Sequence, residues 1–122
     1  MMGTGPDALT VDQVLARDGL RCVRCGRRID MGDFSIHHRR PRKMGGTRDE
    51  TINRCDNLVT LCGTGTTGCH GWVESHRAAA YALGLLVHSH HYSWAVPIIT
   101  HRGPRELTRD GQSIPTDKPI DQ

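Results

Sequence analysis

Residues 57–73 read NLVTLCGTGTTGCHGWV, and this stretch decides the fold. A brief apolar run from Asn57 to Cys62 is followed by the Gly/Thr loop GTGTTG, which connects Cys62 to Cys69. From His70 the chain reads HGWVESHRAAAYALG, where apolar residues recur along one helical face before the stop at Gly84. The stretch predicts a short apolar segment, a sharp turn that brings two cysteines together, and a helix over about 70–83.

A second cysteine pair lies upstream in RCVRCGRR, residues 21–28, a spacing typical of a zinc knuckle. Four thiolates complete the tetrahedral coordination of zinc. A chain of 122 residues with 4% aromatic residues has a small core and needs such a metal cross-link for stability. Cys55 is a rival ligand, and buried thiols acting as small hydrophobes are the other interpretation. We favour Cys69 over Cys55 because it directly precedes His70. The predicted ligands of a structural Zn²⁺ are Cys22, Cys25, Cys62 and Cys69.

Farther out, turn and periodicity signals predict the remaining elements. Thr10 and Gln13 resemble a capping box, which predicts a helix over about 11–18. Residues 29–40 favour a hairpin or a bent pair of strands around Gly32 and Asp33, and 41–56 favour a surface loop. Asp110-Gly111 predicts a C-terminal β-hairpin. We therefore expect a flexible N-terminus over 1–9, one domain over 10–116 and a loose tail over 117–122.

Positive charge is concentrated in one third of the chain. Between Arg17 and Arg54 lie eleven of the sixteen Lys and Arg residues, against five Asp and Glu. Such a stretch is the expected footprint of a phosphate-backbone partner, although a solvated basic face has the same composition. No apolar run approaches the roughly 20 residues needed to cross a bilayer, and no secretory signal pattern is present. We expect a cytoplasmic protein with no membrane role, in which paired cysteines bind metal.

Four motifs in this order, CVRC (22–25), IHHRRPRKMGG (36–46), DNLVTLC (56–62) and CHGWV (69–73), resemble the HNH endonuclease family. The resemblance runs from about Cys22 to Arg77. It implies an α+β protein built on a small ββα-metal (His-Me finger) domain with a structural zinc knuckle. The N-terminal helix and the C-terminal β-hairpin predicted above would flank that domain.

The resemblance also implies the site. The first histidine of the motif maps onto His38, which is the implied general base. An oxygen of Asn57 would accept a hydrogen bond from the ring N–H of His38. His37 and His70 would bind a catalytic divalent metal, and adjacent histidines can share one site only where the strand bends or ends. Glu74, one helical turn after His70, is the expected third ligand in a position where many relatives have His or Asn. His76 is a weaker candidate.

The implied reaction is hydrolysis of a DNA phosphodiester bond, with Mg²⁺ or Mn²⁺ as the catalytic ion. The metal would stabilise the departing 3′ oxygen while His38 activates water, leaving 5′-phosphate ends. Contacts to flanking phosphates are expected from Arg39, Arg40, Arg42 and Lys43. Small relatives are common in tailed bacteriophages, beside DNA-packaging proteins, so such proteins are implied as partners.

Two other functions fit the same sequence. A non-catalytic zinc-stapled DNA-binding module explains the cysteines and arginines, but leaves the spacing of His38, Asn57 and His70 as coincidence. A structural or protein-interaction zinc domain predicts no salt-dependent affinity for DNA. Trp72 and Tyr81 are expected to pack from the helix into the hydrophobic core, and not to stack on bases. No functional role is expected for His88, His90, His91 and His101.

Overall fold

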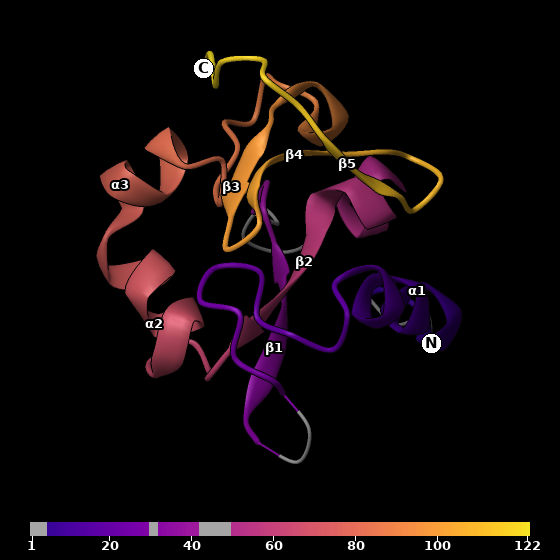
Figure 1. Cartoon of the computed structure of the whole chain (residues 1–122), viewed down its shortest axis with the longest axis vertical. Helices are drawn as coiled ribbons and strands as arrows, with labels where there is room; N and C mark the ends of the chain where they lie inside the picture. Colours follow the sequence, from indigo (N-terminus) through magenta and orange to yellow (C-terminus); the bar gives the residue numbers. More distant parts are fainter. Residues whose placement is uncertain (1–4, 30–31, 42–49) are drawn as a thin grey trace.

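The computed structural model describes residues 5–29, 32–41 and 50–122. Helices surround two separate antiparallel sheets, so the predicted α+β class is confirmed (Figure 1). The helices are α1 (Ala8–Arg17), α2 (Gly68–Ser75) and α3 (Arg77–Ala82). The strands are β1 (Phe34–His38), β2 (Leu58–Cys62), β3 (Ile98–Thr100), β4 (Gly103–Leu107) and β5 (Ser113–Pro115). Short 3-10 turns span Glu50–Asn53, Cys55–Asn57 and Ser93–Ala95.

The strand that carries the histidine pair is β1, and it pairs with β2. The register runs antiparallel from Phe34 opposite Cys62 to His38 opposite Leu58. The expected hairpin within 29–40 is therefore wrong, because β1 finds its partner across the long connection. The physical reason is burial: every residue of β2 is buried, so its backbone groups need a partner strand. The unit β1–β2–α2 is a ββα arrangement.

The N-terminal helix begins earlier than the sequence predicts. It starts at Ala8, because the carboxylate of Asp7 accepts a hydrogen bond from the Thr10 N–H at 2.8 Å and caps the helix. The proposed capping box at Thr10 is wrong. At the other end, Arg17 donates to the carbonyls of Cys55 and Leu58 at 2.7 and 2.6 Å. These bonds hold α1 beside β2.

The helix expected over 70–83 is two helices, because the chain leaves helical geometry at His76 (φ −130°, ψ 55°). The hydroxyl of Ser75 donates to the Gly71 carbonyl at 2.9 Å, a contact that competes with regular helix hydrogen bonding. The His76 ring stacks on Trp72, with centroids 4.9 Å apart. The break ends α2 one residue after Glu74 and starts α3 in a new direction (Figure 1).

The C-terminal sheet has the order β3–β4–β5. Its second hairpin turns at Asp110-Gly111, as predicted, with Gly111 at φ 94°. The expectation of a loose tail is wrong for Gln122, whose side chain donates to the carbonyls of Tyr81 and Leu86 and accepts from the His88 N–H. No helix within the described ranges has both the length and the apolar character that a bilayer crossing requires.

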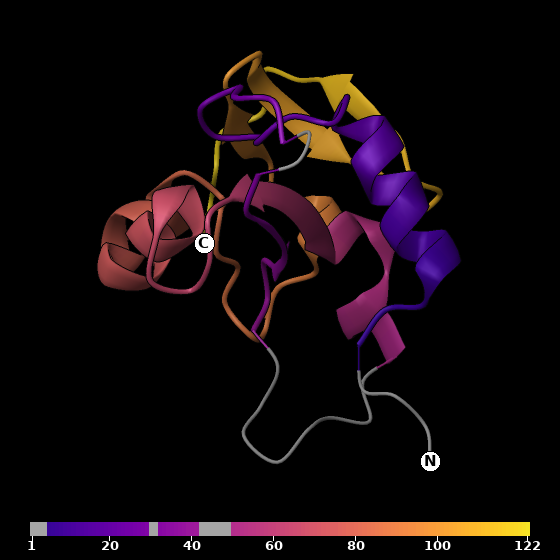
Figure 2. The ribbon, with the colours of Figure 1, turned by 90° about the horizontal axis from the view of Figure 1, so that it is seen from below.

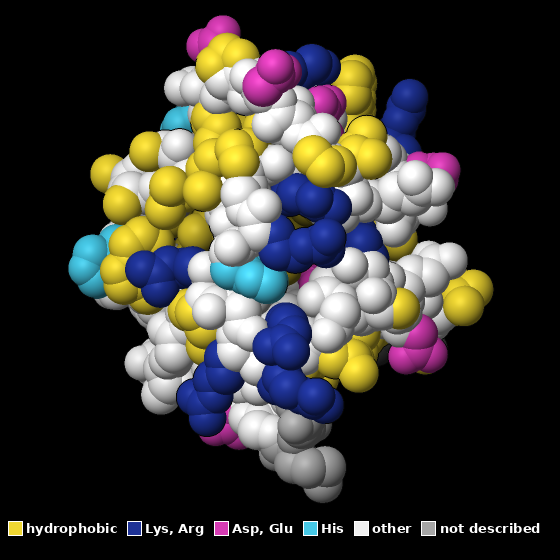
Figure 3. All heavy atoms as spheres, in the orientation of Figure 1, with side chains coloured by type: hydrophobic (Ala, Val, Ile, Leu, Met, Phe, Trp, Pro, Cys, Tyr) yellow, Lys and Arg dark blue, Asp and Glu magenta, His cyan; other side chains and the backbone are white. Residues whose placement is uncertain are grey.

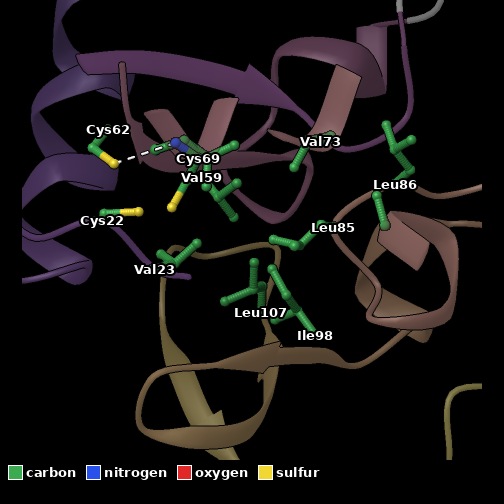
Figure 4. Close-up of a cluster of buried hydrophobic side chains, with 12 residues drawn as sticks. Cys22, Val23, Val59, Cys62, Cys69, Val73, Leu85, Leu86, Ile98 and Leu107 are labelled. Carbon is green, nitrogen blue, oxygen red and sulfur yellow. Dashed lines mark hydrogen bonds between the residues drawn. The ribbon is translucent and has the colours of Figure 1, made fainter. Parts of the chain in front are cut away.

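The main core lies between β2, α2 and the three-stranded sheet. Figure 2 shows β2 in the middle, with α2 and α3 on one side and α1 on the other. Buried aliphatic residues from these elements meet the cysteine side chains in one cluster (Figure 4), which includes Val59, Val73, Leu85, Ile98 and Leu107. The cysteines therefore extend a small hydrophobic core, as the low aromatic content requires.

Candidate metal centres and active site

Four of the five cysteines form one cluster. The Sγ atoms of Cys22, Cys25, Cys62 and Cys69 all lie within 4.8 Å of one another. The first two stand on a tight turn closed by the Arg21–Arg28 bridge, and the others stand at the end of β2 and in the first turn of α2. Figure 4 shows the sulfurs of Cys22, Cys62 and Cys69 converging, and the Cys69 N–H donates to Cys62 Sγ at 3.4 Å. The structure brings together the four residues that the sequence singled out.

The chemistry of this cluster fits a cation. Burial raises the pKa of the Cys22 thiol, and burial together with the neighbouring sulfurs raises the pKa of Cys69 to about 12. Arg24 acts in the opposite direction by donating to Cys69 Sγ at 3.3 Å. Four thiolates in contact repel one another unless a metal ion neutralises them, and a Cys₄ set is a typical zinc site. The cluster can hold Zn²⁺ as a structural ion.

Cys55 lies outside this cluster. It packs with Val14 and Leu58 in a smaller apolar group, and its thiol donates to Gln13 Oε1 at 3.4 Å. The rival ligand set containing Cys55 is therefore not the one that the structure assembles.

A second group of possible metal ligands forms between β1 and α2. One ligand atom each from His37, His70 and Glu74 lies within 4.8 Å of the other two. The rings of His37 and His70 are 5.2 Å apart between centroids and meet at 60°. Two imidazoles and one carboxylate are a suitable donor set for a divalent ion that keeps other coordination positions for water and substrate.

The hydrogen bonds of the two histidines favour this assignment. The Nε2–H of His37 donates to the Leu85 carbonyl at 2.8 Å, which leaves the lone pair on Nδ1. Burial lowers the pKa of His37 to about 4 and also lowers the pKa of His70, so both rings are neutral near pH 7. His70 Nδ1 is buried and has no hydrogen-bond partner among the described residues. A buried nitrogen of this kind is unusual unless a ligand binds it.

His38 lines the same pocket as the metal-binding group, together with Ile36, Pro41 and Arg77. Strand β1 ends at His38, and this ending lets two adjacent side chains serve one site. His38 Nε2 lies 2.8 Å from Asn53 Oδ1. An amide oxygen only accepts, so Nε2 is the protonated nitrogen and the lone pair is on Nδ1.

No sequence pattern predicts this role for Asn53. It lies four positions before Asn57, outside the quoted motifs, and no spacing marks it. Asn57 was expected to hold the His38 ring, and that expectation is wrong. The Asn57 side chain is buried, its Oδ1 accepts from the Arg40 N–H at 2.7 Å and from the Ser93 hydroxyl at 2.5 Å, and its Nδ2 donates to the Ile52 carbonyl. Asn57 therefore fixes the backbone that follows β1.

Comparison with known families gives the same segment. The family model of the HNH endonucleases matches residues 22–70. This segment is an HNH domain. It contains the four clustered cysteines, both histidines of β1, Asn57 and His70, while Glu74 lies just beyond it. Comparisons with curated proteins and with solved structures gave no match.

The arginines next to the histidine pair of the HNH domain are not surface residues. Arg39 is 0% exposed, and its guanidinium donates to five backbone carbonyls, those of Gly84, Asp56, Ser93, Val96 and Pro97. The expectation that Arg39 binds phosphate is therefore wrong. Arg40 is 8% exposed and reaches the Thr51 hydroxyl. Arg42 and Lys43 lie outside the described residues.

The other histidines lie away from the two ligand groups of the HNH domain. Among the residues that the structure describes, His76, His88, His90, His91 and His101 belong to neither group. His76 Nδ1 contacts the hydroxyl of Ser75, and the His88 ring stacks on Tyr81 with centroids 3.9 Å apart. Glu74 is thus the residue of α2 that joins His37 and His70, and His76 is not.

Proposed function

We propose that this protein is a metal-dependent endonuclease that hydrolyses DNA phosphodiester bonds. The observation that carries the proposal is the shared pocket, in which His38 stands beside the ligand group of His37, His70 and Glu74. A base and a metal-binding group side by side suit attack of water on a phosphodiester. The match of residues 22–70 to a family of endonucleases supports the same reaction.

His38 is the proposed general base. Its Nε2–H donates to Asn53, so the Nδ1 lone pair accepts the proton of the attacking water as the new P–O bond forms. The bond from phosphorus to the 3′ oxygen breaks and the departing oxygen takes a proton from solvent water, which leaves a 5′-phosphate and a 3′-hydroxyl. A divalent ion such as Mg²⁺ or Mn²⁺, held by His37, His70 and Glu74, would supply positive charge for the phosphate and the departing oxygen.

The remaining residues shape and hold the pocket. His37 joins β1 to the Leu85 carbonyl, and Asn57 joins the backbone of Arg40, just after β1, to the Ser93 hydroxyl. The cysteine cluster, with Zn²⁺ as its proposed ion, joins the knuckle to the end of β2 and the start of α2. Because His70 directly follows Cys69, the structural metal sets the position of one ligand of the catalytic metal.

The proposal is tested with supercoiled plasmid DNA in the presence of Mg²⁺ or Mn²⁺. Wild type should nick the plasmid, and His38→Ala should lower the rate by about 10²- to 10⁴-fold while keeping its fold and its zinc. His90→Ala, which changes an exposed histidine outside both ligand groups, is the matched control and should nick like wild type. Equal nicking rates for wild type and His38→Ala would contradict the proposed active site.

A further inference from the structure

Arginine side chains from two distant parts of the sequence meet on one face of the molecule. The cysteine-bearing turn (residues 21–28) packs on the turn between β3 and β4, where the His101 N–H donates to the Val23 carbonyl at 2.8 Å. Gly26 lies so close to the His101 ring that a Cβ there would be 2.9 Å from Nδ1. We call this surface the knuckle face and define it by Arg21, Arg24, Arg27, His101, Arg102 and Arg105.

The knuckle face is distinct from the proposed active site. None of its residues lines the pocket that contains His38, His70 and Glu74. His101, Arg102 and Arg105 instead line a different pocket, whose apolar residues are Val23, Val59, Ile98 and Leu107. A partner on this face therefore contacts the protein at a second place.

Several of these arginines are held in position by the fold. Arg24 lies over the Trp72 ring, 3.7 Å from its centroid, and Arg21 donates to the Gly26 carbonyl at 2.9 Å. Arg105 donates to the hydroxyl and the carbonyl of Ser113 at 2.9 and 2.8 Å. Ordered guanidinium groups lose less conformational entropy when they bind an anion.

Positive charge exceeds negative charge on this face. Figure 3 shows Lys and Arg side chains gathered around a histidine in its centre and below, with most Asp and Glu side chains towards the edge. Of the carboxylates nearby, Asp18 is paired with Arg17 at 2.9 Å, and Asp33 lines the same pocket as Arg27. Burial and the neighbouring Arg102 lower the pKa of Arg105. Nearby negative charge from a partner would relieve this repulsion between the two arginines.

We propose that the knuckle face is a second nucleic-acid contact surface, which binds the phosphate backbone of the DNA that the proposed function acts on. Guanidinium groups match phosphate oxygens in geometry, and their distribution over two turns suits a partner whose negative charge repeats along its length. Contacts of this kind position the duplex without reading its sequence. The inference rests on the proposed function for the identity of the polyanion.

The test compares two double variants that remove the same charge. Arg27→Ser/Arg102→Ser changes two exposed residues of the knuckle face whose side chains have no structural hydrogen bond in the described part of the chain. Arg109→Ser/Lys118→Ser changes two exposed residues that lie elsewhere, beside Trp94 and Glu106. Both are made in full-length His38→Ala protein, and affinity for a fluorescein-labelled DNA duplex is measured by anisotropy between about 50 and 200 mM salt.

The knuckle-face variant should bind more weakly, and the slope of log K against log salt should become shallower by about 1.8, since each lost phosphate contact removes about 0.9. The control variant should keep the slope of its parent. Equal slopes for the two variants would overturn the inference, whether both match the parent or both are shallower. Plasmid nicking by wild type is measured separately. If wild type does not nick but the two double variants still differ in salt slope, the result counts against the proposed function alone.

Discussion

At the residue scale, the site depends on which nitrogen of each histidine is already engaged. His37 uses Nε2 on the Leu85 carbonyl, and His38 uses Nε2 on Asn53 Oδ1, so each ring has its lone pair on Nδ1. The His37 ring is buried beside His70 and Glu74, while the His38 ring is half-buried in the pocket. These two adjacent, chemically identical side chains are thereby suited to the different roles proposed for them.

Asn53 is expected to be a positioning residue for His38. Asn53→Ala removes the acceptor that fixes the ring, and plasmid nicking should fall about 10- to 100-fold, as for other residues that orient a site histidine. Asn53→Asp keeps an acceptor but adds charge, which raises the pKa of the imidazole and shifts the acid limb of the nicking pH profile to higher pH. An Asn53→Ala protein that nicks at the wild-type rate would show that the contact between Asn53 and His38 does not contribute to the reaction.

The residues of the site were only partly predictable from the sequence. The spacing of His70 and Glu74 places them on one helical face, and the structure does bring both to His37. The contact between His38 and Asn53 could not be predicted, because it joins a strand to a 3-10 turn across the long loop. The burial of Arg39 could not be predicted either, since a run of charged residues normally indicates a segment exposed to solvent.

At the element scale, the fold around the two groups of candidate metal ligands is held by short, irregular segments. The knuckle turn, the end of β2 and the start of α2 each supply cysteines to one cluster. Gly68, at φ 61°, lies so close to the Cys62 carbonyl that a Cβ would be 2.6 Å from its oxygen. Glycine at this position lets the chain bring Cys69 back to Cys62, which the wide spacing of this pair requires.

The two classes of cysteine should respond differently to replacement. Cys25→Ser removes a ligand of the proposed zinc, and since structural zinc supplies about 10–16 kcal/mol of apparent binding free energy, the variant should lose its metal and melt without a cooperative transition. Cys55→Ser should retain near-stoichiometric zinc and a cooperative melt. Elemental analysis and thermal circular dichroism measure both properties. Full zinc content in Cys25→Ser would contradict the assignment of the cluster.

Element type was more predictable than element pairing. The apolar run of β2, the helical periodicity after His70 and the turn at Asp110-Gly111 all correspond to elements of the described chain. Pairing of β1 with β2 was not predictable, because two strands far apart in sequence are joined by tertiary packing and not by a turn signal. At the break before α3, the Ser75 hydroxyl donates to the Gly71 carbonyl, a local contact that periodicity does not report.

At the scale of the whole molecule, Arg39 joins the HNH domain to the C-terminal part of the chain. Its guanidinium donates to the carbonyls of Ser93 and Val96, and its own carbonyl accepts from the Val87 N–H at 2.8 Å. Arg39 directly follows His38, so its contacts with the C-terminal part of the chain also hold the end of β1 in place. A motif arginine that resembles a phosphate ligand is here part of the interior.

Arg39→Lys should therefore be strongly destabilising although it keeps the charge. A lysine ammonium lacks the planar fork that serves several carbonyls at once, and the free energy of unfolding should fall by about 3 kcal/mol. Arg102→Lys, at an exposed position, should change it by less than about 0.5 kcal/mol. Urea denaturation of both variants measures the difference. Similar stabilities for the two lysine variants would show that the buried contacts of Arg39 contribute little.

The proposed active site requires a divalent ion between β1 and α2, beside His38. Titration with Mn²⁺, with the free ion followed by electron paramagnetic resonance, tests this directly in zinc-loaded protein. Wild type and His38→Ala should each bind one Mn²⁺ with similar affinity. The affinity of His70→Ala for Mn²⁺ should be at least about tenfold lower. Unchanged Mn²⁺ affinity in a folded His70→Ala protein would contradict the proposed active site.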